Sequence, residues 1–285
     1  MRRSKQHRCI GIDFSGAMDA GQRLWITVAW WSGASRCLTV ESVRSACEEL
    51  ACDPSPADTF PALVDFLKSN HDAIVAVDAP LSLPLPVMTS GWNQTVLASP
   101  SRFPAPESLR QELGETKRQT DRETRTPMAP GNLRLYRQTY AAIVHVLHPL
   151  LTARAARVFP MMSIRPDQPT LIEACPASAI KHAASCDQLT LAPYKGRTSG
   201  HIEQRRRIFN WLHTQINLDL SPKEQRIILE DQGGDALDSL ICTALAAGAL
   251  SEFGQPQSEI HSREGRVFYR LPDETPVVAA SVGST

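Results

Sequence analysis

The sequence lacks several features that would point to particular classes of protein. No stretch approaches the roughly 18 consecutive apolar residues of a transmembrane helix. The seven cysteines are scattered and include no Cys-x-x-Cys pair, which argues against a disulfide framework or a structural zinc site. The 30 basic and 30 acidic residues cancel, so the overall charge does not favour nucleic acid as a partner. These absences predict a cytoplasmic chain with no membrane partner.

What the sequence does contain is two short apolar runs, each of which ends in an aspartate. The first closes on Asp13, and the second, residues 73–78, closes on Asp78. Runs of β-branched residues bounded by Gly or Pro are typical of buried strands. A carboxylate at the end of a buried strand is costly unless a cation satisfies its charge. Because no Lys or Arg is adjacent to either aspartate, both are candidate metal ligands, with Asx-turns as the alternative.

A third acidic point lies far downstream, at the start of an apolar helix predicted over residues 235–252. Asp235 and Asp238 are three positions apart, so both carboxylates share one face of this helix. Both also lie in its first turn, where the helix dipole favours negative charge, and a capping role for Asp235 therefore stays open. Glu173, on another predicted core strand, is a further catalytic candidate, with a solvent-facing position as the alternative.

Carboxylates on rigid elements suit a divalent cation. Hard cations such as Mg²⁺ and Mn²⁺ take oxygen ligands, so either of these is the expected cofactor. Two such ions about 4 Å apart can activate a water and stabilise the leaving oxygen of a phosphodiester. We expect Asp13 to bridge both ions, Asp78 to complete one site, and Asp235 or Asp238 to complete the other. The expected catalytic residues are thus Asp13, Asp78, Asp235, Asp238 and Glu173.

The hydrophobic pattern predicts an α/β protein with a mixed five-stranded sheet flanked by helices. The expected strands are residues 8–14, 23–31, 36–43, 73–78 and 171–175, with an edge strand over 266–271. The expected helices are residues 60–70, 132–147, 177–185, 200–217 and 235–252. Pro61 is expected in the first turn of the earliest helix. Short connections between the first three strands indicate an antiparallel meander, and the helix before residue 73 indicates a parallel crossover.

The composition changes along the chain without dividing it into two domains. The 285 residues are expected to form one domain, with a core of about residues 8–80 and 170–271. The segment over about residues 81–169 begins with many Pro, Ser, Thr and charged residues. We expect it to be a mainly loop and helical insertion, after the fourth strand, that covers the strand ends. Residues 273–285 are small and polar, which predicts a disordered tail.

The order of the motifs resembles a known family. The motifs are Gly11-Ile12-Asp13, Val77-Asp78-Ala79-Pro80-Leu81, Ile172-Glu173-Ala174-Cys175-Pro176 and Asp235-Ala236-Leu237-Asp238-Ser239-Leu240, with Tyr194-Lys195-Gly196 and Glu264-Gly265 as later blocks. Over most of residues 8–270 they resemble the uncharacterised family of predicted ribonuclease H-like nucleases. The resemblance implies a ribonuclease H-like fold and a metal-dependent nuclease. The sequence departs from the best-known ribonuclease H pattern at Asp78, where a Glu is usual, and the shorter side chain would move or loosen a metal.

Several polar residues are candidate contacts for a phosphate of the substrate. Lys195 and Arg197 lie beside Gly196, and glycine lets a backbone approach a ligand closely. Arg122 belongs to a basic stretch of the insertion, and Ser15 follows the first strand-end aspartate. Such groups bind phosphate without reading sequence, and a solvated, salt-bridged surface is the alternative for the arginines. The expected substrate is nucleic acid or a smaller phosphodiester.

Two aromatic residues and a basic helix are further candidates for contacts with nucleic acid. Trp92 and Phe103 lie in the insertion and could stack on bases, although single aromatic residues in loops are as often local anchors. Arg205, Arg206 and Arg207 form a compact triplet on the helix predicted over residues 200–217, where a solvated surface is again the alternative.

Two other functions stay open from the sequence. The actin-like ATPase and sugar-kinase superfamily shares the same core, and a nucleotide-binding phosphotransferase would bring residues 13–16 near a nucleotide phosphate. That function needs a duplicated domain and a further Gly-rich phosphate loop, for which Gly233-Gly234 is a poor candidate. A non-catalytic ribonuclease H-like module is the third hypothesis. The sequence distinguishes neither DNA from RNA nor endonuclease from exonuclease, and it indicates no oligomeric state.

Overall fold

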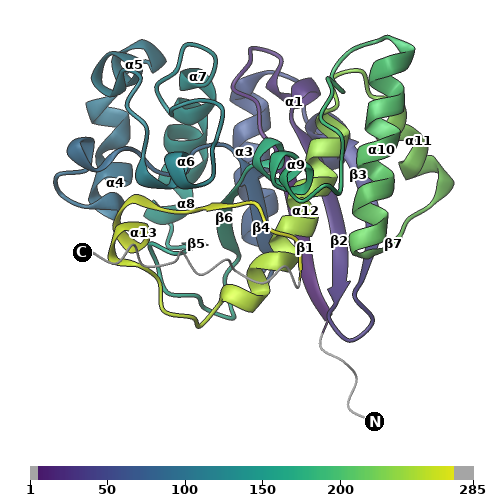
Figure 1. The fold of residues 1–285 in the computed structure, drawn as a ribbon. Coiled ribbons are helices and arrows are strands. Elements are labelled where there is room, and N and C mark those ends of the chain that lie inside the picture. Colours follow the sequence, from purple (N-terminus) through teal and green to yellow (C-terminus); the bar gives the residue numbers. More distant parts are fainter. Residues whose placement is uncertain (1–5, 273–285) are drawn as a thin grey trace, which may run out of the picture.

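The structure, a computed structural model, describes residues 6–272, and its strands form one mixed sheet (Figure 1). The sheet has eight strands in the order β5-β6-β4-β1-β2-β3-β7, with β8 paired to β6. A mixed α/β sheet is thus confirmed, whereas the prediction of five strands is wrong. Of the strands beyond those five, β8 confirms the edge strand predicted over residues 266–271, whereas β5 and β7 contain only two or three residues each, too few for an alternating pattern to identify. The tail predicted over residues 273–285 lies outside the described residues.

The five strands predicted from the apolar runs all exist, within one or two residues of the expected bounds. The strands are β1 (Gln6–Asp13), β2 (Trp25–Ser32), β3 (Cys37–Ser45), β4 (Ile74–Asp78), β5 (Arg157–Val158), β6 (Thr170–Ala174), β7 (Asn217–Asp219) and β8 (Val267–Phe268). β1, β2 and β3 form the predicted antiparallel meander. β4 lies parallel to β1, and β6 lies parallel to β4, so the carboxyl ends of these three strands meet at one edge of the sheet.

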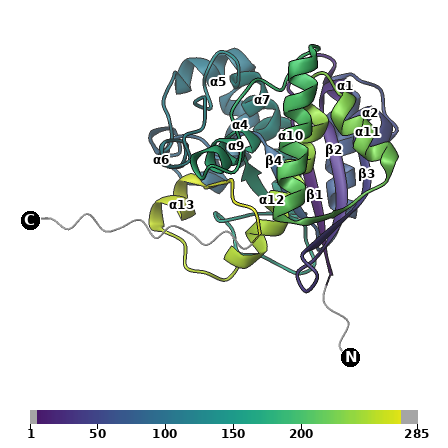
Figure 2. The ribbon, with the colours of Figure 1, turned by 45° about the vertical axis from the view of Figure 1, so that its right-hand side comes forward.

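Helices cover both faces of this sheet (Figure 2). The helices are α1 (Ala20–Arg23), α2 (Ala46–Leu50), α3 (Pro56–Ser69), α4 (Trp92–Arg102), α5 (Pro106–Leu113), α6 (Gln119–Glu123), α7 (Tyr136–Tyr140), α8 (His148–Thr152), α9 (Pro176–Ser185), α10 (Ser199–Gln215), α11 (Pro222–Glu230), α12 (Asp235–Ala249) and α13 (Glu259–Glu264). Two 3₁₀ turns (Leu85–Val87 and Leu250–Glu252) and a π-helical segment that joins α7 to α8 (Ala141–Leu147) complete them. Within residues 6–272, no helix combines the length and apolar character that crossing a bilayer requires.

The helix predicted over residues 60–70 begins earlier than expected. α3 starts at Pro56, and the Ser55 hydroxyl accepts a hydrogen bond from the backbone amide of Asp58 at 3.3 Å. Serine before proline is a favourable helix start, because the hydroxyl caps an amide of the first turn and proline has no amide that needs a partner. Pro61 therefore lies inside the helix, and its predicted position in the first turn is wrong.

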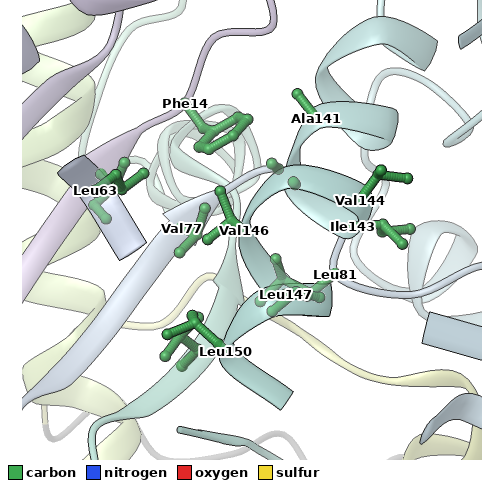
Figure 3. Close-up of a cluster of buried hydrophobic side chains, with 14 of the residues drawn as sticks. Phe14, Leu63, Val77, Leu81, Ala141, Ile143, Val144, Val146, Leu147 and Leu150 are labelled. Carbon is green, nitrogen blue, oxygen red and sulfur yellow. The ribbon is translucent and has the colours of Figure 1, made fainter. Parts of the chain in front are cut away.

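The central strand β4 is buried on both faces, and its alternate side chains contribute to two hydrophobic cores. Val75 and Val77 belong to a core that α3 and the helices of the insertion complete, part of which Figure 3 shows. Ile74 and Ala76 belong to a second core, completed by α9, α10 and α12. A strand covered on both faces is apolar along its whole length, which explains the unbroken run before Asp78. The first charged group of β4 therefore lies at its carboxyl end.

The insertion after β4 consists mainly of helices and loops, as predicted, and it packs against the sheet. Its helices α4 to α8 lie together beside the part of the sheet that contains β5 and β6 (Figure 1). Trp92 and Phe103 are buried in the first core, and the Trp92 Nε1 donates a hydrogen bond to the backbone oxygen of Leu81 at 2.8 Å. Both aromatic residues therefore anchor the insertion, and the prediction that they could stack on bases is wrong.

Candidate metal centre

The two strand-end aspartates lie next to each other in the sheet. β1 and β4 are adjacent parallel strands, and Asp13 is the register partner of Asp78. Both follow unbroken apolar runs, because their strands are covered by helices on both faces. The carboxyl edge of a parallel sheet is where ligands bind in α/β proteins, since loops rather than further strands follow there.

The third carboxylate reaches this edge because α12 packs unusually close to β1. A Cβ atom on Gly11 would lie 2.0 Å from the backbone oxygen of Ser239, so only glycine permits this approach. α12 begins at Asp235, after Gly234 in the left-handed conformation with φ of 75°. Its first turn thus lies at the ends of β1 and β4, where the Asp238 side chain meets the two strand-end aspartates.

Three of the predicted ligands form one compact group. Asp13, Asp78 and Asp238 each have a carboxylate oxygen within 4.8 Å of those of the other two. Asp13 is 8% exposed and Asp238 is 2% exposed, so their charges are largely removed from water. Such a group is costly without a cation, since neither the solvent nor a full set of partners compensates it.

The pKa values of all three carboxyl groups are raised above their ordinary value. Burial, followed by the charge of Asp238, raises the pKa of Asp78 to about 8. Burial also raises the pKa of Asp13 well above its ordinary value, against the opposing effect of the Lys195 ammonium. The pKa of Asp238 is raised by burial as well, although Lys195 and Tyr194 oppose the shift. Burial is the main cause of all three shifts, and for Asp13 and Asp78 the neighbouring carboxylates add to it.

A lysine and a tyrosine that precede α10 contact the first turn of α12. The Lys195 Nζ lies 2.7 Å from Asp238 Oδ2 and 2.9 Å from Asp235 Oδ1. The Tyr194 hydroxyl donates a hydrogen bond to Asp238 Oδ1 at 2.8 Å. Burial lowers the pKa of Lys195, but the carboxylates of Asp238 and Asp13 outweigh it, and the net pKa is raised. Lys195 is therefore the cation nearest the carboxylate group, and Asp235 pairs with it instead of joining that group.

The segment with Tyr194 and Lys195 is held from behind by a buried arginine. Arg205, which is 0% exposed, donates hydrogen bonds to the backbone oxygens of Tyr194 at 2.6 Å and Gly196 at 3.0 Å. It also donates to the backbone oxygen of Leu229 at 2.9 Å. The prediction that Arg205 belongs to a basic surface is therefore wrong, because its guanidinium is engaged in fixing this segment.

Asp235 is not needed as a cap of α12, although the sequence left that role open. The nearby Asp231 has it instead, since its side chain accepts hydrogen bonds from the backbone amides of Gly233 at 3.1 Å and Ala236 at 3.0 Å. The Asp235 carboxylate is left to contact Lys195. Asp13, Asp78 and Asp238 are likewise not occupied by Asx-turns among the hydrogen bonds of the described residues.

Glu173 is buried rather than solvent-facing, and its partner is an arginine of the insertion. The Arg118 guanidinium bridges Glu173 and Asp121, with 2.7 Å to Asp121 Oδ1, and all three side chains are almost fully buried. The backbone amide of Leu81 donates a further hydrogen bond to Glu173 Oε2 at 2.9 Å. Burial raises the pKa of Glu173, while Arg118 opposes the shift. Glu173 thus lies beside the carboxylate group without belonging to it.

The carboxylate side chains described above, apart from Asp231, line one pocket of about 560 Å³ together with Arg118, Tyr194 and Lys195. One wall comes from β1, β4 and α12, and the facing wall comes from the insertion. The insertion contributes Thr126, Pro127, Met128 and Leu135, together with Gln138, which donates a hydrogen bond to the backbone oxygen of Asp78. The pocket therefore exists only because the insertion folds back over the strand ends.

The predicted substrate contacts divide into two pairs. Ser15 and Lys195 both line this pocket. Arg122 and Arg197 are exposed and do not line it, so their predicted role in binding a substrate here is not supported. The pairing of Arg118 with Glu173 was not predicted, because nothing in the order of the residues indicates that it pairs with a residue 55 positions away. Tyr194 lies within one of the family motifs, but its bond to Asp238 follows only from the fold.

The fold and the site define a mixed α/β protein with a carboxylate group at the ends of parallel strands. Residues 11–258 match the profile of the family described as "Protein of unknown function (DUF429)", and the chain belongs to that family. No curated protein and no solved structure matches the chain.

Proposed function

We propose that this protein is a metal-dependent phosphodiesterase, with the ribonuclease H-like nucleases as the class it resembles. The observation that supports this best is the convergence of Asp13, Asp78 and Asp238 from three separate segments. The group is buried, its pKa values are raised, and it forms the floor of an open pocket. Carboxylates that lie in a cleft and have perturbed pKa values are candidates for a functional site.

The donor set of this group fits a hard divalent cation. Every ligand is a carboxylate oxygen, which favours Mg²⁺ or Mn²⁺ over softer metals. Such an ion would balance the negative charge of these buried carboxylates, whose pKa values burial raises. When bound there, the ion would act as a Lewis acid on a phosphoryl oxygen and lower the pKa of the attacking water.

One ion suits these residues better than the two expected from the sequence. The carboxylates of Asp235 and Asp238 already share the Lys195 ammonium, at 2.9 and 2.7 Å. A second ion between them would have to displace it. We therefore assign to the Lys195 ammonium the role of the second metal ion. In that role it would hold a substrate phosphate against Asp13 and Asp78. Tyr194 keeps Asp238 in position through its hydroxyl.

The phosphotransferase alternative receives less support. It requires a nucleotide cleft between two like domains, whereas all strands within residues 6–272 belong to one sheet. Experiment distinguishes the proposed enzyme from a non-catalytic module, because the hypothesis of a non-catalytic module predicts neither metal binding nor hydrolysis.

The test is metal binding and hydrolysis by the wild type and by Asp13→Asn. We expect calorimetry with Mn²⁺ to give one site per chain, and affinity to fall in the variant by more than the ~10- to 100-fold typical of residues outside the ligand set. Hydrolysis of bis(4-nitrophenyl) phosphate and of labelled oligonucleotides should be lost together with binding. Asp65→Asn is the matched control, since Asp65 lies on the exposed surface of α3, where it pairs with Lys68. Absence of Mn²⁺ binding by the wild type at millimolar concentration would falsify the proposal.

A further inference from the structure

A second pocket, of about 320 Å³, adjoins the carboxylate pocket and has the opposite charge. Three cationic side chains line it: Arg125 after α6, Lys181 on α9, and Arg270 after β8. The acidic side chain in its lining is Glu123, whose carboxylate already contacts the His261 ring at 2.8 Å. Arg125 and Lys181 alone give this pocket a local excess of positive charge in a chain with a formal net charge of zero, and this excess favours an anionic group.

Arg125 is fixed in place, but its charge is not used by the fold. Its backbone is in the left-handed region, with φ of 54°, which is uncommon for a residue with a side chain. The Lys181 Nζ donates a hydrogen bond to the Arg125 backbone oxygen at 3.2 Å, and the next residue, Thr126, donates its amide to the backbone oxygen of Asp121 at 3.0 Å. Among the described residues, the Arg125 guanidinium has no hydrogen bond or ion pair. An exposed cation on a held backbone is therefore presented to the solvent of this pocket.

The two pockets meet at two places in the chain. Arg125 lines the basic pocket while Thr126 lines the carboxylate pocket. On α9, Ser178 lines the basic pocket while Ala177 lines the carboxylate pocket. Successive Cα atoms are about 3.8 Å apart, so the pockets lie on either side of two thin walls. A ligand longer than one pocket would have to cross one of these walls to contact both pockets.

We infer that the substrate is a nucleic-acid strand. The phosphate that neighbours the reacting one along this strand lies in the basic pocket, which Arg125, Lys181 and Arg270 line. This inference rests on the proposed function, in which the reacting phosphate lies at Asp13 and its partners. A small phosphodiester would fill the carboxylate pocket alone and gain nothing from the basic pocket. A polyanion gains a phosphate contact that carries no sequence information, as nucleic-acid backbones generally do.

The experiment compares a basic-pocket variant with a matched control. The test variant is Arg125→Asn with Lys181→Gln, because Asn tolerates the left-handed backbone of residue 125. The control is Lys223→Gln with Arg226→Gln, which removes the same two charges from the exposed surface of α11, outside both pockets. Thermal melting of both double variants shows whether either has lost its fold. The single variant Arg125→Asn tests the loss of one charge by itself.

Binding is measured by anisotropy of a labelled single-stranded dodecanucleotide, with Ca²⁺ present and with EDTA present. We expect the test variant to bind roughly tenfold more weakly than the control. The slope of log affinity against log salt should fall by about 0.7 for each phosphate of a single strand that the variant no longer neutralises. Hydrolysis of bis(4-nitrophenyl) phosphate with Mn²⁺ should be equal in the two variants.

The outcomes separate this inference from the proposed function. Equal oligonucleotide binding and equal salt slope in the test and control variants would overturn the inference, even if both hydrolyse the small diester. Weaker oligonucleotide binding by the test variant, in a protein that hydrolyses neither substrate, would support the phosphate contact and overturn the proposed hydrolysis. A loss of small-diester hydrolysis in the test variant would also count against the inference, since the basic pocket would then act on the carboxylate pocket itself.

Discussion

Two buried groups of carboxylates border the same pocket, and their charges are balanced in different ways. Glu173 and Asp121 share the Arg118 guanidinium, which is itself 1% exposed. Asp13, Asp78 and Asp238 face one another, and their nearest cation, Lys195, has a side chain that is 48% exposed. The first group has a dedicated buried partner, whereas the second depends on a lysine that water also reaches.

The difference fits a structural role for the first group and the metal-binding role that we propose for the second. A guanidinium that makes paired hydrogen bonds to buried carboxylates fixes both in one geometry and joins the insertion to the sheet. Carboxylates that lack such a partner keep their affinity for an added cation. Burial does not distinguish the two groups, since both are buried. The hydrogen-bond donors available to each group distinguish them.

The largest effect should come from breaking the balanced group. We expect Arg118→Met to lower the free energy of unfolding by about 3–5 kcal/mol, since removal of one partner leaves two buried carboxylates uncompensated. The measurement is urea unfolding followed by circular dichroism. Arg206→Met, which breaks an exposed pair with Glu203, should change stability by no more than about 0.5 kcal/mol. Adding Glu173→Gln and Asp121→Asn to Arg118→Met should recover much of the loss, and an equal effect of both arginine variants would contradict the comparison.

A smaller effect should appear in the pH dependence of the unbalanced group. Asp78 has a folded pKa of about 8 against an ordinary value of 3.8, so folding takes up a proton between these pH values. Its contribution to stability is therefore present at low pH and is lost as the pH rises through about 8. In EDTA, we expect the melting temperature to fall between pH 5 and pH 8 by at least about 2–4 °C, which corresponds to about 1 kcal/mol at this chain length.

Two controls refine the pH experiment. Asp78→Asn should flatten the profile, because an amide has no charge to lose or gain. Mn²⁺ should also flatten it, because the ion stabilises the ionised carboxylates in the folded state. A wild-type profile that rises with pH over this range, or one that Asp78→Asn leaves unchanged, would show that the three carboxylates are balanced by other groups.

The smallest effect should come from Lys195. Lys195→Met removes the ammonium that competes with a metal ion for Asp238, so we expect Mn²⁺ to bind roughly threefold to tenfold more tightly. Hydrolysis should nevertheless fall, because the substrate phosphate would no longer have the ammonium that we propose binds it. Lys68→Met, which removes an exposed lysine paired with Asp65, is the control for general charge. Weaker Mn²⁺ binding in Lys195→Met would indicate that the lysine positions the carboxylates rather than competes for them.

Some of the fold could be predicted because the pattern that encodes it is local. The five longer strands follow from apolar runs, and α12 follows from an apolar segment that opens with two aspartates. The short strands β5 and β7 could not be predicted, since two or three residues carry no period, whereas β8 lies within the edge strand predicted over residues 266–271. The ribonuclease H-like arrangement and the one-domain organisation stay predictions. The strands and helices agree with the predicted elements, but no solved structure matches the chain and so none tests the topology.

Part of the site was also local in origin. The sequence by itself determined where the candidate ligands are: Asp13 and Asp78 end buried strands, and Asp238 lies in the first turn of a buried helix. It did so because a buried strand excludes charge along its length and admits it only at its end. It also determined Gly11, the one residue small enough for α12 to approach β1.

Only the tertiary structure decided which charges meet. Lys195 reaches Asp238 from a segment that Arg205 holds, and Arg118 reaches Glu173 from the insertion. These pairs join residues far apart in the chain, and their strength depends on distance and burial, neither of which is written in the order of the residues. The same holds for the basic pocket, where Arg125 and Lys181 come together only when the insertion folds against α9.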